Sequence, residues 1–411
     1  MRNNNENVPE TDARERRILT LTCFGHFMSH FNMLVFPAVL LPLAGRMNTD
    51  MAEVLGISFW MYLLFGLTAL PWGMAADRWG AVPLLLIFYM GAGLSGLASA
   101  FWIDSPAGLS ICLAGIGFFS GIYHPAGLGW ISKEIRRVSL GMAYNGMFGN
   151  LGLAAAPLLA GIVNWLWGPQ AVYLALGCLN FAGVGLILFS PKDSVQERKK
   201  TMSREKDVSV RAFFILLACM MLGGIVYRGA TVILPAYFEL RNQGIFEWLS
   251  GLSTGNLSPN VVATSVTSLI YLLGMAGQYA GGWAGERFEL RRCYLIFHCM
   301  TVPVAFLMSL ASDIPLVMLS MIYFFFLLGM QPVENTLVAR FTPKKFHSAA
   351  YGTKFVLTFG VGSLAVKMME GVKVNWGIGA AFPMLGLVSL MLVCGITVLI
   401  FNTRNLRSDD V

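Results

Sequence analysis

Charge is scarce in this 411-residue chain. Asp, Glu, Lys and Arg together make up 12% of the residues, whereas soluble domains carry about 25%. Hydrophobic residues account for 56%, and the mean hydropathy is +0.64. So little charge excludes a large water-soluble core and indicates a chain that crosses a membrane many times.

Cysteine and histidine are also few, with seven and five residues. The cysteines lie in or beside apolar runs at irregular spacing, which excludes a disulfide framework and a zinc-finger pattern. The net charge of +7 could suit nucleic acid, but the basic residues are spread over short segments between apolar runs rather than gathered in one patch. We expect no nucleic-acid partner and no cofactor.

Apolar runs fill most of the chain, and each is about the 20 residues that a membrane span needs. The run at 138–191 is long enough for two spans with a turn near Gly168. A polar, basic stretch divides the runs into two sets of six and should lie in solvent or on the membrane surface. The predicted organisation is a disordered tail (1–17), a six-helix bundle (18–191), a linker (192–211), a second six-helix bundle (212–403) and a tail (404–411).

Basic residues concentrate in the tails, the linker and every second loop. Cytoplasmic loops carry the excess of Lys and Arg, so both termini are predicted to be cytoplasmic, in a multi-pass protein of the cytoplasmic (inner) membrane. The longest outside loop, residues 239–260, contains Phe246 and Trp248 and predicts a short interfacial helix.

One short pattern occurs twice: a glycine, three further residues, an acid and an arginine. The copies lie 209 residues apart, about half the chain, and each follows a long apolar run. A charged turn repeated at this distance predicts two halves with one fold, which is typical of secondary transporters with a site between the halves. The two copies are Gly73, Asp77 and Arg78 with a trailing Gly80, and Gly282, Glu286 and Arg287.

Six spans, a basic linker, six further spans and a Gly-x-x-x-Asp-Arg-x-Gly loop after span two resemble the major facilitator superfamily. The resemblance covers essentially the whole chain. It implies an all-α membrane protein of twelve transmembrane helices in two pseudo-symmetric six-helix bundles, with a cavity lined by spans one, four, seven and ten. It also implies that the loop charges act as a latch that opens and closes as the halves rock. A solvated turn is the plainer interpretation of the same charges.

Within that superfamily the chain resembles the fosmidomycin-resistance-type branch. The residues that carry this resemblance are 25–30 in span one, 123–127 in span four and 227–229 in span seven. In span five, the spacing from Gly149 to Gly161 is similar to a motif of export antiporters. Ala replaces Gly at two of its positions, and the basic pair expected after the first loop motif is missing.

Ionisable side chains inside spans cost about 2.5–3.5 kcal/mol at the membrane centre, so they usually face a cavity. His26 and His30 are four residues apart and share a face of span one. Two histidines at this spacing could bind a metal, but no third ligand lies nearby in sequence, and no metal site is predicted. The predicted cavity residues are His26, His30, His124, Arg228, Glu334 and Lys354.

Each of these residues also has a structural interpretation. The histidines could bond neighbouring helices, and Glu334 could simply pair with Lys354 near the inner surface. Arg228 is the hardest to explain in this way, because a guanidinium in mid-membrane needs a partner.

The cavity residues include one fixed cation, Arg228, and at most one acid, Glu334. A site for cationic drugs would present a buried acid, so an anionic or zwitterionic solute fits better and could bind Arg228 in bidentate fashion. The candidates for proton coupling are His26, His30 and Glu334.

The sequence therefore predicts a secondary transporter that moves a small organic solute or drug by alternating access, most simply by proton-coupled export. One alternative is an uptake symporter or exchanger for an organic anion. Another is a membrane receptor or assembly factor that transports nothing. The expected partners are the solute, a proton and the bilayer, and we expect a monomer. An enzyme is not expected, because no nucleophile and base occur together at membrane depth.

Overall fold

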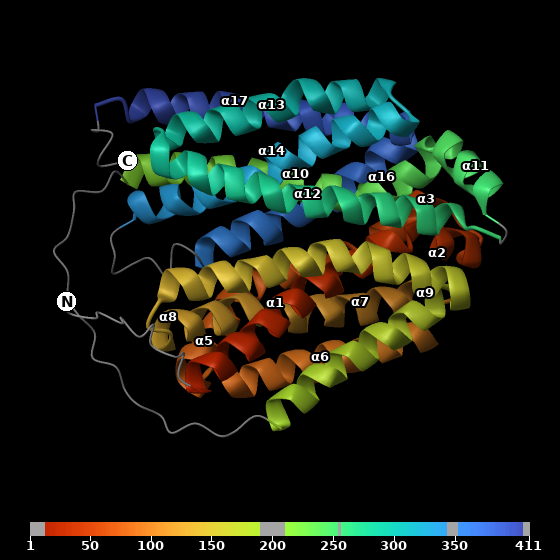
Figure 1. Cartoon of the computed structure of the whole chain (residues 1–411), viewed down its shortest axis with the longest axis horizontal. Helices are drawn as coiled ribbons and strands as arrows, with labels where there is room; N and C mark the ends of the chain where they lie inside the picture. Colours follow the sequence, from red (N-terminus) through yellow and green to blue (C-terminus); the bar gives the residue numbers. More distant parts are fainter. Residues whose placement is uncertain (1–12, 190–209, 254–255, 343–351, 406–411) are drawn as a thin grey trace, which may run out of the picture.

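The computed structural model describes residues 13–189, 210–253, 256–342 and 352–405, and this part of the chain is helical throughout (Figure 1). The first half lies below the second in that view. Its elements are α1 (Ala13–Ala38), α2 (Leu40–Met47), α3 (Met51–Ile57), α4 (Phe59–Leu67), α5 (Ala69–Trp79), α6 (Ala81–Phe101), α7 (Pro106–Ser120), the π-helical turn η1 (His124–Leu128), α8 (Gly129–Glu134) and α9 (Val138–Leu188).

The second half repeats this arrangement of long helices. One short helix, α11, occupies the predicted position in the loop after span seven, with Trp248 66% exposed. The elements are α10 (Val210–Arg241), α11 (Gln243–Leu252), α12 (Pro259–Arg287), α13 (Leu290–Leu310), α14 (Asp313–Arg340), η3 (Val356–Gly360), η4 (Val361–Ser363), α16 (Leu364–Trp376), η5 (Ile378–Ala380) and α17 (Ala381–Asn402).

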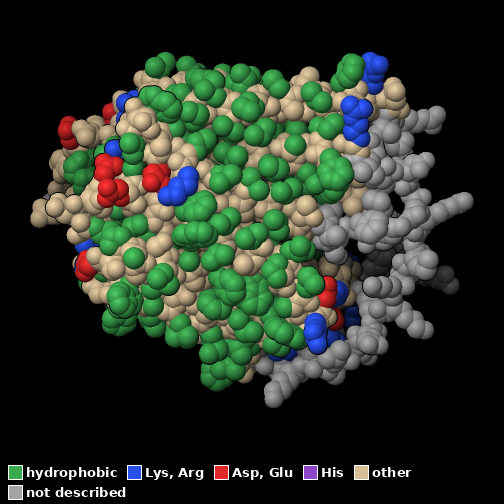
Figure 2. All heavy atoms as spheres, turned by 180° about the vertical axis from the view of Figure 1, so that it is seen from behind, with side chains coloured by type: hydrophobic (Ala, Val, Ile, Leu, Met, Phe, Trp, Pro, Cys, Tyr) green, Lys and Arg blue, Asp and Glu red, His purple; other side chains and the backbone are tan. Residues whose placement is uncertain are grey.

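The described residues account for twelve spans, as predicted. Ten of their helices are long and apolar enough to cross a membrane, and the pair formed by α2 and the segment 51–67, bent by 111°, counts as an eleventh. The longest of the ten, α9, contains two spans because its backbone breaks at Gly168. Figure 2 shows hydrophobic side chains over the middle of the molecule and charged ones toward its two ends, as a bilayer requires.

Three short turns between spans share one construction, a tryptophan followed by a glycine. Gly80, Gly168 and Gly377 have φ of 84°, 81° and 77° with ψ near 170°, a region that is essentially restricted to glycine. Gly168 and Gly377 are 209 residues apart, the same distance as the two loop motifs. The turns between spans five and six and between spans eleven and twelve are therefore further copies of one duplicated element.

The chain enters the first bundle earlier than expected. Helix α1 begins at Ala13 rather than at residue 18. Arg14 pairs with Glu134 at 2.9 Å, and the backbone N–H of Arg136 donates to Glu15 at 2.8 Å. These contacts hold the first helical turn against the end of α8. The linker prediction falls mostly on residues 190–209, which lie outside the described residues.

We call the end where α1 begins and α17 finishes the terminal end, and the opposite end the far end. At the far end the two halves are joined. Asn260 of α12 accepts from Asn164 at 2.9 Å and donates to the Ala38 carbonyl at 2.9 Å. Ser268 donates to the Ala154 carbonyl at 2.5 Å. The halves are therefore closed together on this side.

An ion pair adds to the closure at the far end. Asp50 of the first half lies 3.2 Å from Lys373 of the second. The Ala52 backbone N–H, and after it Lys373, lower the pKa of the Asp50 carboxyl. The Asp50 carboxyl is therefore charged at neutral pH, and its contribution to the closure is lost as the pH falls through this lowered pKa.

We expect Gly168→Ala to lower the free energy of unfolding by about 1–3 kcal/mol, because a side chain at this positive φ is strained. The measurement is thermal or denaturant unfolding of the purified protein. Gly185→Ala is the control, since this glycine of the same helix has ordinary helical φ and open space around it. Equal stability of the two variants would contradict the role assigned to the turn.

Candidate functional site

A cavity of about 1460 Å³ lies between the two halves. The exposed residues Asp77 and Lys133 line it at the terminal end, and His30 lines it about halfway along α1. Because the far end is closed, the cavity opens only toward the terminal end. The predicted residues that line it are His26, His30, His124, Glu334 and Lys354.

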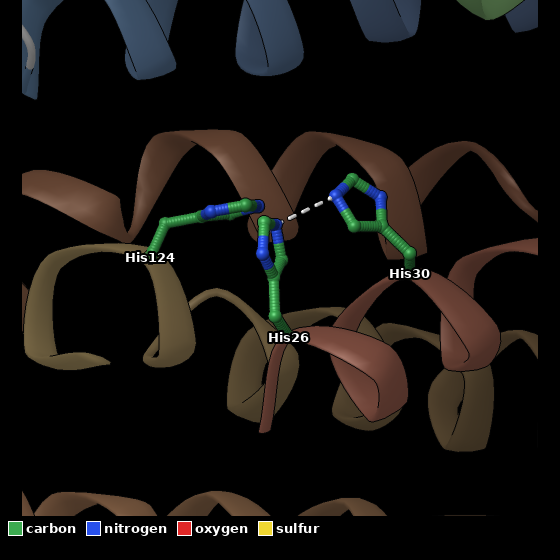
Figure 3. A group of neighbouring side chains, drawn as sticks. All are labelled: His26, His30 and His124. Carbon is green, nitrogen blue, oxygen red and sulfur yellow. Dashed lines mark hydrogen bonds between the residues drawn. The ribbon is translucent and has the colours of Figure 1, made fainter. Parts of the chain in front are cut away.

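Three histidines meet in this cavity (Figure 3). His26 and His30 project from one face of α1, and the Nε2 atoms of the two rings are 3.1 Å apart. His124, almost a hundred residues further along, brings its ring centroid to 5.2 Å and 5.4 Å from theirs. No third metal ligand lies close to His26 and His30 in the sequence, and for that reason no metal site was predicted. The fold brings His124 to them from a distant segment.

The His26 ring is held in place by α9. Its Nδ1 lies 2.8 Å from the Asn145 carbonyl oxygen, so this nitrogen carries the proton, since a carbonyl only accepts. The Asn145 amide donates in turn to the Tyr123 hydroxyl at 2.6 Å. Gly149 gives the ring its space, because a Cβ there would lie 2.6 Å from the imidazole.

His124 sits at the start of the π-helical turn η1, and such turns are frequent at functional sites. Its side chain is 5% exposed, and neither ring nitrogen has a hydrogen-bond partner among the described residues. Phe355 and Phe359 of the second half stack on the ring at 4.9 Å and 5.7 Å. The two phenylalanine rings lie 5.7 Å from each other, so they cover the same side of the His124 ring.

Arg228 is not among the side chains that line the cavity in this conformation. It is 3% exposed, and its guanidinium lies 4.0 Å from the centre of the Tyr62 ring, which belongs to the first half. This cation–π contact supplies the partner that a guanidinium in mid-membrane needs. Its positive charge therefore lies behind the wall of the cavity rather than on it.

Glu334 and Lys354 form a buried ion pair, with 2.8 Å between Oε1 and Nζ. The other carboxylate oxygen accepts from the Tyr294 hydroxyl at 2.9 Å. The Lys354 ammonium also donates to the Asn335 side chain. The predicted pairing is therefore present, and it joins span ten to span eleven at the cavity wall.

A chain of amides was missed by the sequence reasoning. Asn150 of α9 donates to Gln278 of α12, and Gln278 donates to Gln331 of α14 at 2.7 Å. All three line the cavity. The chain crosses from the first half to the second. Neutral amides leave no charge pattern, so a search for ionisable groups does not find them.

The first loop motif makes its ion pair within its own half. Asp77 lies 2.7 Å from Lys133 at the end of α8, and both side chains are well exposed. Arg78 is exposed, and none of the ion pairs seen in the described residues includes it. A Cβ built on Gly73 would lie 3.4 Å from Pro125, an ordinary contact distance. Within the part of the chain that the structure describes, no ion pair joins this turn to the second half.

The second loop motif differs from the first. Arg287 stacks on Trp283 at 4.3 Å. The acid that binds the following basic pair is Glu289, which contacts Arg291 and lies 3.4 Å from Arg292. A Cβ built on Gly282 would lie 3.9 Å from Pro332, which matches the position of Gly73 beside Pro125. The glycines of the two copies are equivalent, whereas their charges are used differently, and Glu286 is not the acid that the basic pair contacts.

The sequence profile of the Major Facilitator Superfamily matches residues 22–366. The chain belongs to this superfamily. It is therefore a multi-pass membrane transporter of small molecules rather than an enzyme. The resemblance to the fosmidomycin-resistance-type branch stays a prediction.

Known proteins similar to this chain include the class B tetracycline resistance protein of Escherichia coli. The two are 25% identical over 251 residues, a match that covers 58% of this chain and 60% of that protein. The chain thus spans about three fifths of the length of this relative in the match.

Solved structures share the fold over nearly the whole chain. A bacterial homologue of the human lysosomal transporter Spinster, in an inward-facing and occupied conformation, has a TM-score of 0.69 at 12% identity, over 97% of this chain and 99% of that one. A POT family transporter in complex with 5-aminolevulinic acid has a TM-score of 0.71 at 15% identity, over 95% and 96%. At these identities the likeness shows the fold alone.

We expect Lys354→Met to destabilise the protein by about 3 kcal/mol, because it leaves the Glu334 carboxylate buried without its cation. Adding Glu334→Gln should recover most of the loss, since no charge is then left unpaired. The measurement is thermal unfolding of the three proteins in one detergent at neutral pH.

Lys367→Met is the matched control. It removes a lysine from a pair with Glu370 that is largely exposed, and a loss below about 1 kcal/mol is expected. If Lys367→Met lowered the free energy of unfolding as much as Lys354→Met, burial of the Glu334–Lys354 pair would not explain the loss.

Proposed function

We propose that this transporter exports a small anionic or zwitterionic organic solute across the cytoplasmic membrane by alternating access, driven by protons. One observation carries the choice of solute. Every carboxylate that lines the cavity is already paired: Asp77 with Lys133, Glu134 with Arg14, and Glu334 with Lys354. A cationic solute finds no unpaired acid there, whereas an anion meets the field of Arg228.

The orientation rests on the distribution of basic residues. With the terminal end in the cytoplasm, the cavity of this conformation opens inward and can receive a solute from the cell. Export is supported by the similarity to a tetracycline resistance protein. Export is also supported by span five, whose spacing from Gly149 to Gly161 is similar to a motif of export antiporters. Two glycines of this motif, Gly152 and Gly161, bring α9 into close contact with Phe27 and Thr264.

Outward opening then requires the far-end contacts to break. These are the ion pair of Asp50 with Lys373 and the hydrogen bonds of Asn260. The terminal end closes in the same step, and the turns at Asp77 and Glu286 come within reach of the opposite half, where they act as the latch. Lys133 must release Asp77 for this to happen.

Proton coupling falls to Glu334. A proton on this carboxylate abolishes its ion pair with Lys354 and frees span eleven, which carries Phe355 and Phe359 of the cavity wall. Proton and solute are then carried on opposite half-cycles. The same protonation leaves the Lys354 ammonium without its carboxylate, so it can bind an anion. The position of this pair in the cavity wall therefore favours a second candidate, an uptake symporter in which proton and anion bind together.

The direction is tested in proteoliposomes with an imposed pH gradient. The solute is first chosen by thermal shift from a panel of carboxylates, phosphonates and zwitterionic drugs. An exporter accumulates it when the lumen is acidic, because outward proton flow drives it in. A symporter accumulates it only when the medium is acidic. No flux of any stabilising compound under either gradient would favour a receptor.

The same assay tests the coupling residue. Glu334→Gln should abolish accumulation driven by protons while exchange of labelled for unlabelled solute continues. Glu370→Gln, an acid of the same kind paired on the exposed face of span eleven, should behave as the parent protein. Proton-driven accumulation by Glu334→Gln would remove Glu334 from the coupling role.

Arg228→Ala should weaken binding of the anionic solute by about 10-fold, or about 1.4 kcal/mol, because the solute loses the attraction of a positive charge that lies behind the cavity wall. Arg228→Lys keeps the charge and should recover part of the affinity. Isothermal titration or thermal shift at several solute concentrations gives the comparison. Unchanged affinity in Arg228→Ala would refute an anion site that depends on this residue.

A further inference from the structure

We propose that His26, His30 and His124 form a binding site for a divalent transition-metal ion in the central cavity. Imidazole nitrogen is a preferred ligand of zinc, cobalt, nickel and copper. The proposal concerns only the three imidazoles and their neighbours, so it does not depend on which solute is carried or in which direction.

The distances suit a metal. One ring nitrogen of each histidine lies within 4.8 Å of those of the other two. In a tetrahedral zinc site with bonds of about 2.0–2.1 Å, two ligand nitrogens are about 3.3 Å apart. The Nε2 atoms of His26 and His30, at 3.1 Å, already have this separation. In Figure 3 the His26 ring lies between those of His124 and His30, so a nitrogen of His124 must move closer to the other two before three ligands surround one point.

The protonation of His26 also suits a metal. Because its Nδ1–H donates to the Asn145 carbonyl, its Nε2 keeps a lone pair, which accepts from the Nε2–H of His30. A metal ion takes the place of that proton when His30 adopts its other neutral tautomer. Metal-binding histidines usually donate their second ring N–H to a carbonyl or carboxylate in this way. Asn145 is itself held by Tyr123, so the orientation of the first ligand is fixed before an ion arrives.

His124 supplies the independent observation. A buried imidazole without a hydrogen-bond partner carries a desolvation cost that folded proteins normally avoid. His124 is 5% exposed, and neither of its ring nitrogens has a hydrogen-bond partner among the described residues. Phe355 and Phe359 cover one side of the ring and offer its nitrogens no hydrogen-bond partner. A metal ion at one of these nitrogens removes the cost.

The surroundings define the fourth ligand. Arg228 and Lys354 are the cations near the cluster; the first stacks on Tyr62 and the second is paired with Glu334. Their charges oppose a bare divalent ion, so an anionic or water ligand from the cavity side completes the coordination. Three histidines with one open position are also the arrangement of a catalytic zinc site. Here they lie in a transport cavity.

The experiment uses the full chain, purified in detergent with its affinity tag removed and stripped of metal with a chelator. It is titrated with Co²⁺, followed by visible absorption, and with Zn²⁺, followed by calorimetry. We expect one equivalent per chain and the intense visible bands of nitrogen-bound tetrahedral cobalt. His124→Ala and His30→Ala should each weaken binding by more than about 100-fold, since loss of even an outer-shell partner costs 10- to 100-fold.

His298→Ala is the matched control. His298 is fully buried on α13, and its ring nitrogens also lack partners among the described residues, but it lies outside the cluster. It should bind cobalt as the parent does. His124→Cys should recover zinc binding through a thiolate, which separates loss of a ligand from loss of folding. Absence of cobalt bands in the parent, or equal binding by the folded double variant His26→Ala/His124→Ala, would overturn the proposal.

Discussion

A charge in hydrocarbon has no water to solvate it, and this constraint organises the whole molecule. The helices turn apolar side chains outward over the middle of the protein and gather polar ones where the halves meet. There each of these charges has a stabilising partner. The Glu334 carboxylate pairs with Lys354 and accepts a hydrogen bond from Tyr294, and the Arg228 guanidinium stacks on the Tyr62 ring. The cavity is therefore polar without presenting an unpaired acid, and this is the property from which we infer its solute. The same constraint makes every one of these contacts a point where protonation or binding can shift the balance between two conformations.

Duplication explains the frame of the protein but not its chemistry. The glycine turns at Gly168 and Gly377, and the packing of Gly73 and Gly282 on prolines of spans four and ten, are repeated. The polar residues are not. His124 directly precedes one of these prolines and Gln331 directly precedes the other, so an imidazole and an amide occupy corresponding places in the cavity wall. The first half thus contributes the histidines, and the second half contributes the ion pair and most of the amide chain.

Much of the candidate site could be predicted from residue types alone. An ionisable residue within an apolar run must face a cavity or a partner, and five of the six predicted residues do line the cavity. Arg228 lies just behind its wall, because Tyr62 from another span offers a contact that hydropathy cannot reveal. The loop charges were harder to predict. Asp77 is paired with Lys133, and Glu289 contacts Arg291 and Arg292, because several partners of similar energy are available to a charge on an exposed turn.

The sequence by itself determined the number of spans, the duplication, the near absence of buried acid and the identity of the polar residues at membrane depth. These follow from composition and from patterns over about 20 residues, which the thickness of the bilayer imposes directly. Only the tertiary structure decided which of these residues meet. Whether His124 reaches His26, and whether Glu334 reaches Lys354, depends on how each helix is rotated and which helix lies beside it. Those choices are made by close packing between residues far apart in the chain, such as Gly149 against the His26 ring and Phe355 against His124.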